Sequence, residues 1–210
     1  MDTCEASHAA RLAGAIGAAL SALAGAVPTT AWRRSAYPAE VIHELAQVNV
    51  ARLDAPLDHP RLHDFVMALD TVNSEADDAP GFIWRLQADD GNATSIRAFG
   101  WDVDGAAGII VNMSVWTSVE ALADYVYSGQ HLAVMKRRRE WFVPMREAYT
   151  ALWWVPTGHR PTTAEAEERL RQLRRGGPTV NAFTLRRVWP PPGLHAAEAR
   201  VSRDEWFCPA

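Results

Sequence analysis

The chain has 210 residues, of which 48% are hydrophobic, and this is enough to bury one sizeable core. Its formal net charge of -4 excludes the basic surface that nucleic acids or anionic membranes require. The two cysteines, Cys4 and Cys208, lie near opposite ends and form neither a disulfide framework nor a metal pair. This cysteine usage favours a reducing cytoplasm.

The first 40 residues predict a weakly ordered N-terminal extension. Residues 11–27 are apolar and rich in alanine and glycine, but they are too few for a membrane-spanning helix. Asp2 and Glu5 spoil the positive region that a signal peptide carries. We expect one folded domain over residues 41–190 and a C-terminal tail over residues 191–210.

The first part of that domain alternates between strand and helix patterns. Residues 43–52 and 82–87 predict strands. Residues 61–77 predict a helix between them, because apolar side chains recur there at helical spacing. Residues 88–107 are polar and rich in turn-forming residues, and a connection of this length is uncommon unless it covers something.

The middle of the domain predicts a third strand and a long second helix. Residues 108–116 form the apolar run of the strand. Thr117 with Glu120 predicts the N-terminal cap of the helix. Gly129 falls inside the helical pattern, and we expect a kink there.

The last part of the domain predicts a strand, a helix and a further strand. Residues 149–156 form the fourth strand. Thr162 with Glu165 predicts the cap of a third helix, which ends at the glycine pair 176–177. Residues 182–189 predict a short last strand.

The order β-α-β-β-α-β is the split βαβ, ferredoxin-like arrangement of the α+β class, here with an added C-terminal helix and strand. Such a sheet has one face covered by helices and one bare face. A bare face with large aromatic side chains pairs with another copy or covers a ligand, and the chain has nine tryptophans. We therefore expect a homodimer that buries more than roughly 1,000 Å².

Side-chain alternation predicts what each face of the sheet carries. In the third strand Ile109, Val111, Met113 and Val115 suit the helix-covered face. The opposite face carries polar and aromatic side chains from the first and third strands: Gln47, Asn49, Asn112, Ser114 and Trp116. This mixture is typical of a small-molecule pocket, to which Trp84 of the second strand is added. The alternative is that these amides satisfy one another or a buried water molecule.

The second helix supplies the remaining candidate residues. A stripe at steps of three and four contains Tyr127, His131, Met135, Arg138 and Phe142. His131 is the candidate acid/base, although a lone histidine on such a stripe is more often a hydrogen-bonded core residue. Arg138 is the arginine best placed to hold a substrate oxygen.

Four blocks of the sequence resemble one bacterial family, called domain of unknown function 3291. The blocks are "LAQVNVARLDAPLDHPRLHDFVMALDTVNSEADDAPGFIWRL", "NMSVWTSVEALADYVYSGQH", "RRREWF" and "LWWVPTGHRPTTAEAEERL" followed by "GPTVNAFTL". The resemblance covers roughly residues 43–188. It implies the dimeric α/β-barrel superfamily, in which two ferredoxin-like sheets pair and a pocket lies between each sheet and its helices.

The second block is also similar to the W-x-S-x-E-A…S-x-H pattern of the antibiotic-biosynthesis monooxygenases. That resemblance assigns Trp116 and His131 to the site, and Asn112 less directly. The roles of Gln47, Ser114 and Arg138 rest on the predicted faces of strand and helix.

The resulting hypothesis is an enzyme of secondary metabolism that acts on an aromatic or polyketide-like small molecule. It would be a cofactor-independent monooxygenase or a related isomerase or cyclase. Asn112 and Trp116 would orient a carbonyl or phenol, and His131 would remove a proton. Arg138 or Gln47 would stabilise the negative charge that develops.

Two further readings of the sequence stay open. One is a haem protein with His131 as the axial ligand, and the other is a non-catalytic ligand-binding dimer. The sequence contains no flavin or nicotinamide motif and no H-E-x-x-H or C-x-x-C spacing. We therefore expect no metal site and no organic cofactor in the leading reading.

Overall fold

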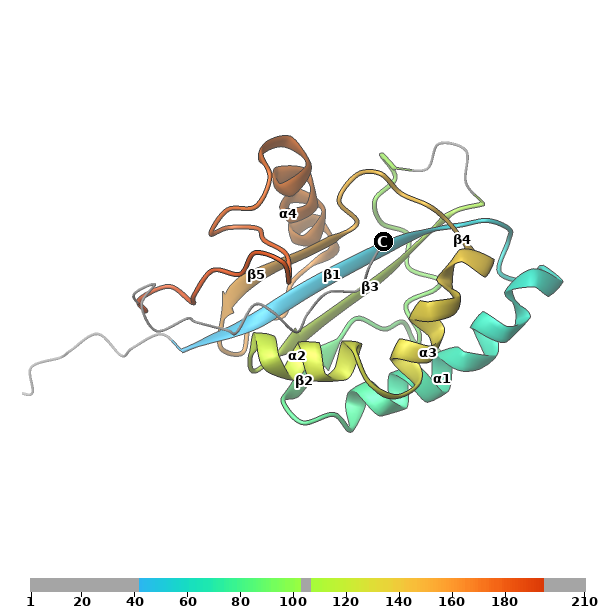
Figure 1. The fold of residues 1–210 in the computed structure, drawn as a ribbon, viewed down its shortest axis with the longest axis horizontal. Coiled ribbons are helices and arrows are strands. Elements are labelled where there is room, and N and C mark those ends of the chain that lie inside the picture. The colour runs from blue at the N-terminus through green and yellow to red at the C-terminus, as the bar shows by residue number, and fades with distance from the viewer. Residues whose placement is uncertain (1–41, 103–106, 195–210) are drawn as a thin grey trace, which may run out of the picture. The chain divides into compact units, whose positions relative to one another are not determined.

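The computed structural model describes residues 42–102 and 107–194 (Figure 1). The expected N-terminal extension, and the expected C-terminal tail beyond residue 194, lie outside these ranges. Within the ranges, no helix combines the length and the hydropathy that crossing a membrane requires.

Strands and helices alternate along the described chain much as the sequence predicts. The strands are β1 (His43–Leu53), β2 (Phe82–Arg85), β3 (Ile109–Trp116), β4 (Phe142–Val143) and β5 (Thr150–Pro156). The α-helices are α1 (His63–Asp77), α2 (Val119–Val126), α3 (Gly129–Arg137) and α4 (Thr163–Gly176). Short 3-10 turns, η1 (Pro60–Leu62) and η2 (Arg138–Glu140), precede α1 and follow α3.

The sheet has the strand order β2-β3-β1-β5 with antiparallel neighbours, and the short β4 pairs with the end of β1. The crossover through α1 joins β1 to β2 around β3, and the crossover through α2 and α3 joins β3 to β5 around β1. This is the ferredoxin-like topology, so the predicted fold class is confirmed.

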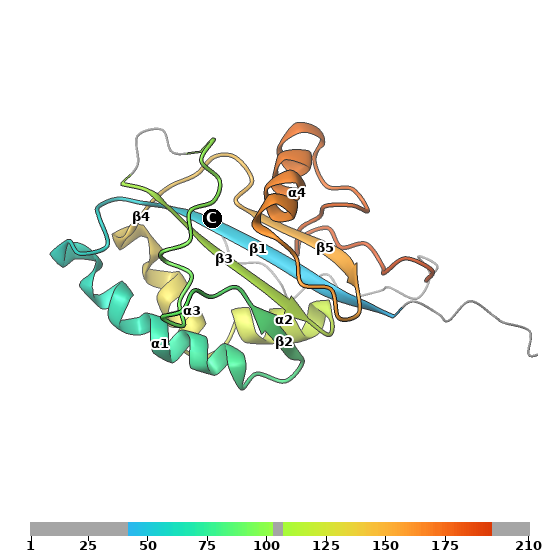
Figure 2. The same cartoon turned by 180° about the vertical axis from the view of Figure 1, so that it is seen from behind.

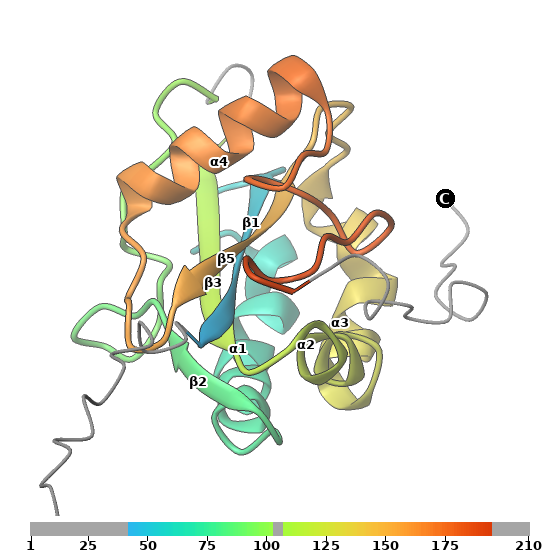
Figure 3. The ribbon, with the colours of Figure 1, turned by 90° about the vertical axis from the view of Figure 1, so that its left-hand side faces the viewer.

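Helices lie on both sides of this sheet (Figure 3). The helices α1, α2 and α3 lie on one side, and α4 lies on the other. Because side chains alternate along a strand, β1 sends Ala46, Val48 and Val50 toward α4. They meet Leu170 and Leu173 of that helix in one buried apolar cluster.

The expectation of a bare sheet face is wrong, because α4 folds back onto the face opposite α1–α3. The apolar face predicted to be under helices is indeed covered, but by the added helix. The polar face lies on the side of α1, α2 and α3. The α4 helix begins as predicted, since the Thr162 hydroxyl accepts the N–H of Glu165, and it ends at Gly177, where φ is 71°.

The connection between β2 and β3 also covers the sheet face under α4, as its length suggested. Figure 2 shows this segment crossing β3. Phe99 is fully buried in the cluster, although its φ of 57° is a strained conformation for a residue with a side chain. Glu167 of α4 holds it there by accepting the Phe99 N–H at 2.9 Å and the Trp101 Nε1–H at 2.8 Å.

A buried ionic cluster fixes the end of this connection. Asp102 is 5% exposed and forms ion pairs with Arg52 of β1 and Arg174 of α4. Its Oδ2 accepts from Arg174 Nη2 at 2.6 Å. One carboxylate therefore ties the central strand, the connection and α4 together.

Three local predictions need correction. The N-terminal cap of α2 is Ser118, which accepts the N–H of Ala121, and not Thr117. The predicted long helix is two helices, because Gly129 has a φ of 52° and starts α3 after a break at Ser128. The predicted last strand is reduced to isolated bridges, of which the one between Phe183 and Leu152 joins this segment to β5.

Candidate functional site

The middle of the sheet face toward α1–α3 is polar, and apolar clusters pack at both ends of it. One cluster, around α2, is built from Leu45, Trp116, Val119, Leu122, Leu152 and Phe183. The other, around α1 and the end of α3, is built from Leu53, Ala55, Leu62, Phe65 and Trp141. The β1–β3 register places Gln47 opposite Ser114 and Asn49 opposite Asn112 between them.

Hydrogen bonds join several of the predicted site residues on this face. Trp116 Nε1 donates to Ser114 Oγ at 2.8 Å, and Ser114 Oγ donates to Gln47 Oε1 at 3.1 Å. All three side chains are buried. This part of the predicted set is therefore a self-satisfied polar core, as the alternative in the sequence analysis held.

The two asparagines of this face are less buried than these three side chains, and they differ from each other in exposure. Asn49 is half-buried and donates from Nδ2 to Thr150 Oγ1 at 2.9 Å. Asn112 is exposed, although it lies on the central part of the sheet. A solvent-exposed amide on a sheet face between two apolar clusters can hydrogen-bond a small molecule, and Asn112 is the predicted residue best placed to do so.

An aromatic column links Trp116 to His131. Tyr125 of α2 stacks on Trp116 with ring centroids 5.1 Å apart, and the centroid of the tilted His131 ring lies 4.9 Å from that of Tyr125. Phe82 meets Trp116 edge-on at 5.3 Å. Tyr125 was not among the site residues predicted from the sequence. Its aromatic ring four positions before the Gly129 break was the available signal, but only the break between α2 and α3 turns it toward His131.

The hydrogen bonding of His131 defines its tautomer. Nδ1 lies 2.9 Å from the carbonyl oxygen of Val126. A carbonyl only accepts, so Nδ1 carries the proton and the lone pair of the neutral ring is on Nε2. Nε2 has no hydrogen-bond partner among the described residues. It is not fully buried either, since Arg52 Nε is the atom of the described residues that is both fully buried and unpaired. Burial lowers the pKa of His131, which favours the neutral ring at pH 7.

The neighbouring tyrosine is tied to α1 and not free to ionise. The Tyr125 hydroxyl donates to the carbonyl oxygen of Val72 at 3.1 Å. Burial, with a further contribution from the charge of Glu75, raises the pKa of Tyr125 far above its ordinary value. Tyr125 therefore contacts its neighbours by packing, and its raised pKa keeps the hydroxyl protonated at neutral pH.

The structure separates other predicted residues from this group. Trp84 packs with the cluster under α4, on the opposite face of the sheet from His131. Arg138 is exposed, and its Nη1 donates to the carbonyl oxygen of Met135 at 2.9 Å. Tyr127 is the C-terminal cap residue of α2, and Phe142 lies in β4. The predicted stripe fails because the break at Gly129 gives the two halves separate helix axes.

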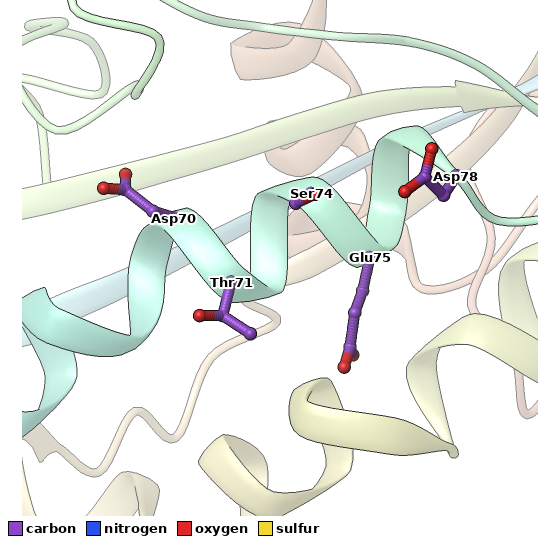
Figure 4. Close-up of a pocket in the computed structure, with 5 residues that line it drawn as sticks. All are labelled: Asp70, Thr71, Ser74, Glu75 and Asp78. Carbon is purple, nitrogen blue, oxygen red and sulfur yellow. The ribbon is translucent and has the colours of Figure 1, made fainter.

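Open hollows on the described surface lie along α1. One has a volume of about 540 Å³ and is lined by Asp70, Thr71, Ser74, Glu75 and Asp78 (Figure 4). The other, at the start of α1, is lined by Leu57, Asp58, His59, Pro60, His63, Asp64 and Val66. Neither is lined by Asn112 or His131. Over residues 42–102 and 107–194, no cluster of three or more histidine, cysteine or acidic side chains is placed to hold a metal ion.

The strand order and the paired crossovers define a ferredoxin-like α+β domain with one extra helix on its second face. The chain belongs to the family described as domain of unknown function (DUF3291), whose model matches residues 44–200. No curated protein matches the chain in sequence. The predicted family is confirmed.

Similar solved structures are distant. SnoaB, a cofactor-independent oxygenase from Streptomyces nogalater, is 16% identical, with a TM-score of 0.34 over 57% of this chain and 95% of that one. Rv0793 from Mycobacterium tuberculosis is 13% identical, with a TM-score of 0.35 over 57% and 99%. NE2512 from Nitrosomonas europaea, a protein of unknown function, is 11% identical, with a TM-score of 0.36 over 58% and 96%. Similarity at this level carries no argument about activity.

Proposed function

We propose that the protein catalyses proton abstraction from a small aromatic or polyketide-like carbonyl compound, with His131 as the general base. The observation that carries the proposal is the state of the imidazole. Its Nδ1–H is fixed by the Val126 carbonyl, and the lone pair of Nε2 has no partner among the described residues. A neutral histidine with a fixed tautomer is ready to accept a proton.

The surrounding residues have separate roles in this proposal. The exposed amide of Asn112 orients the substrate carbonyl or phenol and stabilises the negative charge that develops on its oxygen. The line Gln47–Ser114–Trp116 fixes the indole against which Tyr125 and then His131 pack. Gln47 and Trp116 thus position other groups. This proposal gives no role to Arg138, which is exposed and hydrogen-bonded to its own helix. It gives none to Trp84, which lies on the opposite face of the sheet.

Removal of a proton from a carbon that is next to a carbonyl, or conjugated with one through an aromatic ring, yields an electron-rich enolate or phenolate. Such an enolate can react with oxygen in a cofactor-independent oxygenation, or be reprotonated or close a ring in an isomerisation or cyclisation. We propose this group of reactions without an organic cofactor, and the experiment below separates its members.

The haem alternative stays a prediction. In it His131 would bind the iron through Nε2, the ring nitrogen that has no hydrogen-bond partner among the described residues. No step is assigned to haem.

Two further expectations stay predictions. Helices lie on both sides of the sheet, so two chains have no bare sheet face through which to pair (Figure 3). A homodimer would use another surface. The cytoplasmic location rests on Cys4 and Cys208, which lie outside the described residues.

The test measures proton abstraction directly. Anthrone, whose methylene protons lie between two aromatic rings and opposite a carbonyl, is incubated with the protein in D2O under nitrogen. Loss of the methylene signal by NMR reports the exchange. We expect His131→Gln to slow the protein-dependent exchange by about 10²–10⁴-fold. Oxygen uptake in air then separates oxygenation from isomerisation or cyclisation.

A matched control is His159→Gln, since His159 is bound to Glu165 at the start of α4 and lies away from the site. It should leave the exchange unchanged. Binding of anthrone without any exchange would instead support the non-catalytic ligand-binding reading. Equal exchange by the unaltered protein and His131→Gln would overturn the role of His131.

A further inference from the structure

The first turn of α3 is held by a residue of another helix. Ser128 occupies the cap position of α3, but its side chain makes no capping hydrogen bond. Instead, the N–H of Gln130 donates to Glu75 Oε2 at 2.9 Å. Figure 4 shows Glu75 extending from α1 toward the neighbouring helix. A carboxylate at a helix N-terminus satisfies a free backbone donor and complements the positive end of the helix dipole.

Gly129 permits this close approach. A Cβ at position 129 would lie 2.7 Å from Glu75 Oε2, and the φ of 52° is one that residues with side chains rarely adopt. A glycine is therefore required here for two reasons, conformation and space. The glycine at the break between α2 and α3 thus allows the carboxylate of Glu75 to contact the first turn of α3.

His131 is the third residue of that turn, directly after the residue whose N–H Glu75 accepts. Two groups that can carry charge face it: Glu75 from α1 and Tyr125 from α2. Tyr125 stays protonated, so the charge that acts on His131 is that of Glu75. Burial has the largest effect on the pKa of His131 and lowers it, whereas the hydrogen bond to Val126 and then the charge of Glu75 raise it.

We propose that Glu75 is the positioning residue of this site: it fixes the first turn of α3, and so the direction of the His131 lone pair, and it stabilises His131 when the ring accepts a proton. The proposal rests on the proposed function only in taking His131 as the base. The position of the carboxylate and its effect on the ring do not depend on any substrate.

Two variants of Glu75 separate its charge from its hydrogen bond. Glu75→Gln removes the charge and keeps an oxygen that can accept the Gln130 N–H, whereas Glu75→Ala removes both. NMR follows the titration of His131 in the full chain, with His131→Gln used to assign its signals. We expect the His131 midpoint to move to lower pH in both variants. Hydrogen exchange at the Gln130 amide should become about tenfold faster in Glu75→Ala alone.

Asp78→Asn is the matched control, because Asp78 lines the same hollow on α1 without a hydrogen bond to α3 among the described contacts. It should change neither readout. An unchanged His131 midpoint in both Glu75 variants would overturn the proposal, and so would an unchanged Gln130 exchange rate in Glu75→Ala. If Glu75 shifts the titration but His131→Gln leaves anthrone exchange unaltered, the proposed function fails and the coupling between Glu75 and His131 stands.

Discussion

The two faces of the sheet are covered in different ways. On the face toward α4, the side chains of β1, β3 and β5 form one continuous apolar cluster with that helix and with the β2–β3 connection. On the face toward α1–α3, apolar packing is confined to two separate clusters, and the strands present amides between them. Asn112 is exposed there.

Under the function proposed above, this difference assigns stability and recognition to different sides of one sheet. On the face under α4, Asp102 pairs with Arg52 and Arg174, and Glu167 accepts N–H groups of the connection. Arg52 Nε is buried there without a hydrogen-bond partner among the described residues, so no ligand can reach it. The opposite face retains unsatisfied polar capacity at Asn112 and at Nε2 of His131. Binding and catalytic groups need such capacity, whereas a face that only stabilises the fold does not.

The largest effect is expected from the apolar face. Leu170 of α4 is fully buried, so Leu170→Ala should lower the free energy of unfolding by about 3–5 kcal/mol, through lost burial and the cavity left behind. Urea unfolding followed by tryptophan fluorescence measures it. Leu194→Ala, at a leucine that is 48% exposed, is the control and should change the free energy by less than about 0.5 kcal/mol. Equal effects would show that α4 does not seal the sheet.

A smaller loss is expected from the ion cluster on the same face. Asp102→Asn keeps the shape but leaves Arg52 and Arg174 without their carboxylate. We expect a loss of about 2–3 kcal/mol, because the two arginines are 17% and 15% exposed and keep some hydration. Asp77→Asn breaks an ion pair whose aspartate is 45% exposed, and should cost about 0–1 kcal/mol. A loss no larger in Asp102→Asn would contradict the clamping role.

The polar face should make the free energy of unfolding depend on pH through His131. Burial lowers the pKa of His131 in the folded protein below the value of about 6.5 for an unfolded histidine. Between that value and the lower folded pKa, the unfolded chain binds a proton that the folded protein does not, so the free energy of unfolding falls as the pH drops across this interval. Above about pH 6.5 His131 is neutral in both states, and below the folded pKa it is protonated in both. Urea unfolding between pH 5 and 8 should show this decline, and His131→Gln should flatten it. An identical profile in both proteins would contradict the buried, neutral state.

The smallest stability effect is expected at Asn112. Because Asn112 is exposed, Asn112→Ala should change the free energy of unfolding by less than about 0.5 kcal/mol. Its amide is assigned to the substrate oxygen, so anthrone exchange should slow on the order of 10²-fold. Asn181→Ala, at another exposed asparagine, should affect neither. A large loss of stability with normal exchange would make Asn112 structural.

The sequence by itself determined the order of elements, the family and much of the polar face. Period-two and helical patterns are local properties, so β1, α1, β3, β5 and α4 were predicted within a few residues. Gln47, Asn49, Asn112, Ser114 and Trp116 were placed on one face because alternation along a strand requires no knowledge of its neighbours.

Only the tertiary structure decided which helices cover which face, and which candidates meet. Alternation sorts side chains into two faces without saying what packs on either. The helix α4 therefore covers the apolar face, and α1–α3 lie over the polar face that was predicted to be bare. The short break at Gly129 reorients α3, removes Arg138 from the site and brings Tyr125 between Trp116 and His131. The contact of Glu75 with Gln130 joins residues 55 positions apart. Such contacts depend on how the helices pack on the sheet, and a pattern along the chain does not contain that information.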